Sequence, residues 1–129
     1  MLKRVRNAVL AGGIALALTG TVFAASAYVP DSTVVGNTSV SIGVGISDTL
    51  AYAKVSASDY VYAKMVCTAT YLNNGLSQSI TFTKSMDEST YGEASKYFSG
   101  YVTKNKCTFT VTSSNNVTWE RTMTASTNE

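Results

Sequence analysis

The chain has 129 residues, no histidine, two cysteines and a formal net charge of +2. Without histidine it has no imidazole acid or base, no Ser-His or Cys-His nucleophile, and none of the commonest zinc ligand. No phosphate loop, dinucleotide-binding glycine pattern or calcium-loop spacing occurs in the sequence. We therefore predict a protein that is not an enzyme, with no catalytic residue, no metal and no cofactor.

Residues 1–27 have the features of a secretory signal peptide of the bacterial type. Three basic residues precede an apolar stretch of 11 residues at 8–18, and small residues allow cleavage after Ala24 or after Ala27. A membrane-spanning helix needs about 20 residues, so we expect a cleaved signal and no membrane association afterwards. Cleavage removes three of the ten basic residues and leaves seven against eight acidic ones, a net charge of −1. This charge predicts no nucleic-acid partner.

Cys67 and Cys107 are the two cysteines of the chain. Cysteines in an exported protein most often pair, whereas two free buried thiols would be the alternative. A disulfide that closes a loop of 40 residues contributes roughly 4 kcal/mol in the chain-entropy model. We therefore predict that this disulfide supplies a large part of the stability of a small domain.

The predicted domain covers residues 38–129, and residues 28–37 are expected to lead into it. Apolar residues alternate with serine and glycine over residues 40–46, which indicates a strand with one buried face. A turn at Ser47-Asp48 then leads to a second strand at residues 51–55.

The longest predicted strand runs over residues 59–72 and ends at Asn74-Gly75. Asn-Gly is the strongest short hairpin signal, because both residues tolerate positive φ. With these two residues as the loop, Cys67 faces Phe82, and the apolar positions of both strands share one face.

Residues 86–100 interrupt the alternation. The spacing of Tyr91, Ala94 and Tyr97 predicts a helical turn within a long connection. Two further strands follow at residues 107–112 and 117–124, and their alternation requires a loop of odd length around residues 114–116. The disulfide is then expected to cross the core and tie the central hairpin to the C-terminal one.

About six or seven short strands predict an all-β fold, a small antiparallel β-sandwich of immunoglobulin-like architecture with one disulfide. The signature of an immunoglobulin domain is absent, because Trp119 follows both cysteines and does not lie between them. A small barrel is the alternative.

Aromatic side chains are the most promising candidates for a binding surface. Tyr62 is expected on the outward face of the long strand, and Tyr52 on the outward face of its neighbour; Tyr91 and Tyr97 add to the candidate surface. The alternative is that these rings lie at the edge of the core.

The sequence favours a secreted bacterial module that binds or builds structure at the cell surface or in the extracellular space. Its partners would be a cell-wall polymer, a glycan, a surface protein or a second copy of the chain. An alternative is a small secreted antagonist similar to a bacteriocin. A third hypothesis is a hydrolase that uses a carboxylate pair among Asp87, Glu88 and Glu93.

Overall fold

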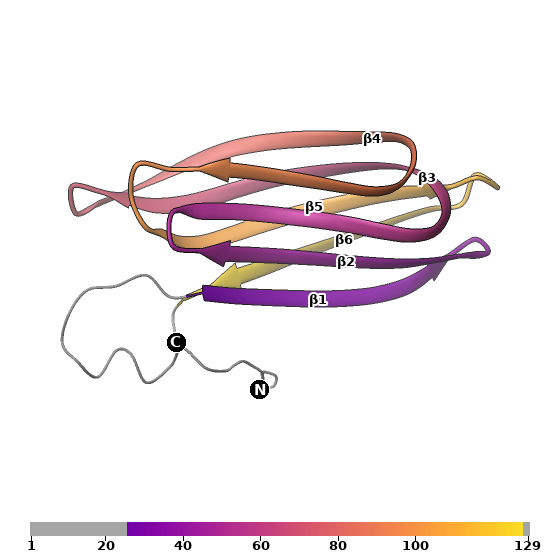
Figure 1. Ribbon diagram of the computed structural model, residues 1–129, viewed down its shortest axis with the longest axis horizontal. Helices are drawn as coiled ribbons and strands as arrows, with labels where there is room; N and C mark the ends of the chain where they lie inside the picture. The colour runs from indigo at the N-terminus through magenta and orange to yellow at the C-terminus, as the bar shows by residue number, and fades with distance from the viewer. Residues whose placement is uncertain (1–25, 128–129) are drawn as a thin grey trace.

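The computed structural model describes residues 26–127, which form an all-β fold (Figure 1). Its strands are β1 (Ser26–Val35), β2 (Thr38–Ser47), β3 (Leu50–Asn73), β4 (Leu76–Tyr97), β5 (Val102–Ser113) and β6 (Thr118–Ser126). Most of the predicted signal peptide, residues 1–25, lies outside the described residues. Residues 26–127 contain no helix long and apolar enough to cross a membrane.

The strands β3 and β4 form one long hairpin that runs through the whole sheet (Figure 1). Asn74 and Gly75 make its two-residue loop, with φ values of 54° and 81°. These positive values suit the tight turn that asparagine and glycine adopt most readily. The predicted register is confirmed, because Cys67 faces Phe82.

Register shifts in β3 between Ser56 and Ala63 divide the sheet into two four-stranded panels. Before the shifts β3 pairs with β2, after them it pairs with β5 on the same edge, and β4 follows the opposite edge throughout. The N-terminal panel consists of β1, β2, residues 50–57 of β3 and residues 91–97 of β4. The C-terminal panel consists of β6, β5, residues 61–73 of β3 and residues 76–89 of β4.

The two panels face each other across one hydrophobic core. The strand β2 contacts β5 and β6, and β1 contacts β6, although these strands belong to different panels. Asp31 on β1 and Arg121 on β6 form an ion pair at this seam. The single continuous sheet is therefore nearly barrel-like, and it lies closer to the alternative of a small barrel than to the two separate sheets of a sandwich.

The predicted alternation fills the core. On β2 the apolar residues of the alternating stretch are buried, and on β3 every second residue from Val61 to Tyr71 is buried. With Phe109 and Val111 of β5 they form a single cluster. Burial of this apolar surface is the main favourable contribution to folding.

The helical turn predicted within residues 86–100 is wrong, because β4 continues to Tyr97 and stays paired with β3. Gly92 and Ala94 face the core on this part of β4, and the odd-numbered residues face outward. Since the inward residues are so small, the stretch lacks the contrast between large apolar and polar side chains that marks a strand. The spacing of Tyr91, Ala94 and Tyr97 therefore imitates a helix.

Two further boundaries differ from the prediction. Residues 28–37, expected as a lead-in, lie mostly in β1, which pairs with β2 along its whole length. The strands expected at residues 51–55 and 59–72 are the two halves of β3. The loop of odd length around residues 114–116 is confirmed, because Thr112 faces Thr118.

Cys67 and Cys107 form the predicted disulfide. The two residues face each other on the adjacent strands β3 and β5, with their Cα atoms 4.1 Å apart, and both are fully buried. The bond ties the central hairpin to the C-terminal one as expected. It does so between neighbouring strands of one panel and does not span from one panel to the other.

Candidate ligand-binding face

The outer face of the N-terminal panel collects three of the four tyrosines proposed from the sequence. Tyr52 lies on β3, and Tyr91 and Tyr97 lie on β4, all at outward positions. A fourth ring, Tyr28 on β1, joins them. Tyr62 does not, because it lies on the outer face of the C-terminal panel, where it pairs with Thr112.

Two glycines of β2 determine how the rings lie. Gly43 and Gly45 occupy outward positions yet are buried, because the ring of Tyr28 covers Gly43 and the ring of Tyr52 covers Gly45. A Cβ atom at either glycine would overlap the ring above it. Glycine in a strand interior commonly marks such a close approach, and an aromatic ring compensates for its missing side chain.

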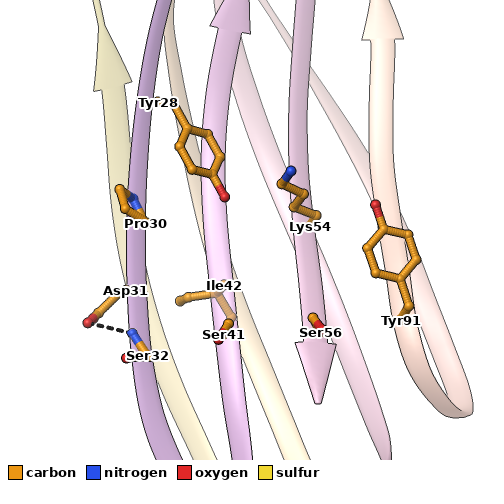
Figure 2. Close-up of a pocket in the computed structure, with 9 residues that line it drawn as sticks. All are labelled: Tyr28, Pro30, Asp31, Ser32, Ser41, Ile42, Lys54, Ser56 and Tyr91. Carbon is orange, nitrogen blue, oxygen red and sulfur yellow. Dashed lines mark hydrogen bonds between the residues drawn. The ribbon is translucent and has the colours of Figure 1, made fainter. Parts of the chain in front are cut away.

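The rings of Tyr28 and Tyr52 are neighbours with nearly parallel planes, and we call this pair the tyrosine platform. Their centroids are 6.2 Å apart and their planes differ by 15°. In Figure 2 the side chain of Tyr28 reaches from β1 over β2. The residue is 45% exposed to solvent. One face of each ring covers a glycine of β2, and Tyr28 is the more exposed of the two, because Tyr52 is half-buried.

A shallow groove of about 580 Å³ runs across the strands beside the platform (Figure 2). Tyr28 stands at one end and Tyr91 at the other, and between them the groove is lined by Pro30, Asp31, Ser32, Ser41, Ile42, Lys54 and Ser56. The ammonium nitrogen of Lys54 lies 5.2 Å from the centroid of the Tyr28 ring. The groove thus offers aromatic faces, hydroxyl groups and one mobile cation.

Both platform phenols are neutral at physiological pH. Burial raises the pKa of Tyr28 above its ordinary value of 10.0. Burial is also the largest cause that raises the pKa of Tyr52, followed by the charges of Tyr28 and Glu93. Each ring can therefore offer an uncharged face together with a hydroxyl that donates or accepts a hydrogen bond.

The three carboxylates proposed for a hydrolase lie on different parts of β4. Glu93 lies on the outer face of the N-terminal panel, opposite Lys54. Asp87 and Glu88 lie where β4 passes between the panels, and the charge of Glu88 is the largest cause that raises the pKa of Tyr62. Glu93 follows Glu88 by five positions on β4, and the register of β3 and β4 shifts between them.

Metal-binding groups are likewise dispersed. Residues 26–127 hold no group of three or more His, Cys, Asp or Glu side chains that could bind a metal ion.

Sequence analysis missed Tyr28 and the two glycines beneath the platform. Tyr28 fell within the expected lead-in segment, so no strand partner was assigned to it. A signal was present in Gly43 and Gly45, since two glycines on the polar face of a strand indicate that something lies against that face.

A buried residue beneath the platform was missed as well. Asn105 on β5 is fully buried, and its amide nitrogen donates hydrogen bonds across the core to the carbonyl oxygens of Gly45 (3.3 Å) and Tyr52 (3.0 Å). From the inner side of the sheet, Asn105 therefore holds the backbone of Gly45 and Tyr52, the residues at the platform. Nothing in the local sequence distinguishes Asn105 from an exposed asparagine.

No protein-family model matches this chain, and neither a curated protein nor a solved structure matches it. The geometry and chemistry of the tyrosine platform and its groove are therefore the basis for assigning a function.

Proposed function

We propose that this protein is a secreted bacterial module, without enzymatic activity, that binds a partner at the cell surface or in the extracellular space. The N-terminal sequence supports export, and the buried disulfide is typical of proteins that work in an oxidising compartment. The binding surface is the outer face of the N-terminal panel.

The tyrosine platform is the observation that carries this proposal. Tyrosine is enriched at binding surfaces because its rigid ring offers a large contact area and its hydroxyl a polar handle. Two such rings lie side by side on one face, and the groove beside them leads to Tyr91. Two glycines at the floor keep both rings flat against the sheet.

Binding to the producing cells tests the proposal. The exported protein, its N-terminus established by intact mass, is incubated with washed cells and with the polymers released into the culture medium, and the bound fraction is measured by sedimentation. We expect saturable binding that the double variant Tyr28→Ala/Tyr52→Ala weakens at least about tenfold, which corresponds to ~1.4 kcal/mol.

Tyr62→Ala is the matched control. Tyr62 is 46% exposed and Tyr28 is 45% exposed, but Tyr62 lies on the C-terminal panel. The control should bind as the unmodified protein does. A protein that binds neither cells nor released polymers would refute the proposed function, and equal losses in Tyr62→Ala and the platform variant would refute the assignment of the surface.

A further inference from the structure

Building on the binding function proposed above, we infer that the ligand of the N-terminal panel is an uncharged, extended polysaccharide chain, which lies on the tyrosine platform and continues along the groove toward Tyr91. The class of ligand follows from three properties of this face: the orientation of its rings, the side chains around them and the balance of charge.

The rings are oriented as a flat surface and do not form a slot. The planes of Tyr28 and Tyr52 are nearly parallel, 15° apart, and each ring lies over a glycine of the same strand. An aromatic face carries partial negative charge and attracts the polarised C–H groups of another molecule. The flat face of a pyranose ring presents such C–H groups, and two neighbouring tyrosines can accept two consecutive sugars of an extended chain.

The side chains around the platform suit a ligand rich in hydroxyl groups. Ser32, Ser41 and Ser56 line the groove from three successive strands. A serine hydroxyl donates one hydrogen bond and accepts two, so it can pair with a sugar hydroxyl in either direction. The Lys54 ammonium, on a flexible stem, adds donors beside the ring of Tyr28.

The charge of the groove does not favour an ionic polymer. Its lining residues include one cation, Lys54, and one anion, Asp31, which is paired with Arg121 of β6. Glu93 lies opposite Lys54 on the same outer face and adds a second negative charge. Binding a polyanion would require a concentration of basic residues. A neutral chain needs none, and it binds through ring faces and hydrogen bonds.

The platform is also rigid before the ligand arrives. Gly43 and Gly45 hold the rings down, and Asn105 fixes the carbonyl groups of Gly45 and Tyr52 from below. Because the rings are already in place, little conformational freedom is lost on binding.

The test uses the exported full-length mature protein with microcrystalline cellulose, chitin and soluble oligosaccharides of each, and with a polyproline peptide as the competing class. We expect sedimentation with at least one of the two polysaccharides, inhibition by its soluble oligosaccharide, and no effect of the peptide. Tyr28→Ala and Tyr52→Ala should each weaken binding about tenfold. Tyr28→Phe and Tyr52→Phe should change it less than about threefold, since the ring face carries the contact.

Gly45→Ala gives a second, independent variant that keeps every aromatic side chain. The added Cβ forces the Tyr52 ring away from the strand, so polysaccharide binding should fall as far as in Tyr52→Ala. Because residue 45 faces outward, the fold should survive, as an unchanged circular dichroism spectrum would verify. Tyr62→Ala again serves as the control.

The outcomes separate the carbohydrate inference from the broader proposal of a binding function. If the protein binds the producing cells but neither polysaccharide, or if it binds the polyproline peptide instead, the carbohydrate inference is overturned and the binding function stands. If it binds a polysaccharide equally well with and without the platform rings, the inference is overturned for this face. If it binds nothing, both proposals fail.

Discussion

The two panels share β3 and β4 but present different chemistry on their outer faces. On the C-terminal panel, hydroxyl groups bond to one another across the strands, in the pairs Thr68–Thr81 (2.9 Å), Thr108–Thr122 (2.8 Å) and Thr112–Thr118 (2.9 Å). On the N-terminal panel the outward positions include four tyrosines and two glycines beside serines, Lys54 and Glu93. Paired threonines stabilise the sheet by about 0.2–1 kcal/mol each and satisfy one another, whereas Tyr28 of the tyrosine platform remains 45% exposed.

The inner faces differ as well. The C-terminal panel fills the core with Met65, Phe109 and the disulfide. In the N-terminal panel the larger inward side chains come from β2, whereas β3 and β4 contribute alanines, one glycine and Val55, at residues 51, 53, 55, 92 and 94. Stability is rarely uniform across a fold, and binding regions tend to come from the less stable part. We therefore expect the C-terminal panel to hold the fold and the N-terminal panel to bind the ligand.

Removing the disulfide should have the largest effect. The double variant Cys67→Ala/Cys107→Ala opens a loop with a sequence separation of 40 residues, and the free energy of unfolding should fall by about 4 kcal/mol in the chain-entropy model. Urea denaturation at low temperature, where the variant still folds, measures the loss.

The same variant tests the division of labour between the panels. Its folded fraction should bind the producing cells with unchanged affinity, because the disulfide lies in the other panel. A loss of less than about 1 kcal/mol would show that the bond stabilises far less than loop closure predicts. A folded variant that no longer binds would show that the platform depends on the C-terminal panel.

The substitution Asn105→Leu should have the next largest effect on stability, because the Asn105 side chain links the two panels by hydrogen bonds. The substitution keeps the approximate volume but removes the side-chain amide that donates to the carbonyl oxygens of Gly45 and Tyr52. Each lost hydrogen bond lowers the free energy of unfolding by about 0.5–1.5 kcal/mol, which urea denaturation would detect. Ligand binding should weaken too, though less than in Tyr52→Ala, and unchanged binding would mean that Asn105 serves the fold alone.

The sequence was most informative where one local signal decides the conformation. Asn74-Gly75 specified both a turn and a register, and the alternation around Cys67 and Phe109 correctly identified the buried faces. Two cysteines without other partners were sufficient to predict the disulfide. These features follow from the preferences of a few neighbouring residues.

Features that depend on contacts between distant segments could not be predicted. The platform requires Tyr28, Gly45 and Tyr52 on three strands to come into register. Tyr28 was not identified because residues 28–37 were predicted to lead into the domain and not to form a strand. The course of β4 past Glu88, a non-glycine residue with φ of 50°, is decided by its pairing with β3. Local spacing at Tyr91 and Tyr97 favoured a helix, and the sheet overrode it.

The ion pair at the seam between the panels should have the smallest effect. The side chain of Arg121 is 49% exposed and that of Asp31 is 29% exposed, and exposed pairs contribute about 0–1 kcal/mol. A double-mutant cycle with Arg121→Gln and Asp31→Asn, read by urea denaturation, should give a coupling energy within that range that decreases as salt is added. Apolar packing between β1 and β6 would then keep the sheet curled. A coupling above about 2 kcal/mol, well outside the usual range for exposed pairs, would mean instead that the nearly barrel-like closure depends on this one ion pair, and with it the position of β1 and of Tyr28 on the platform.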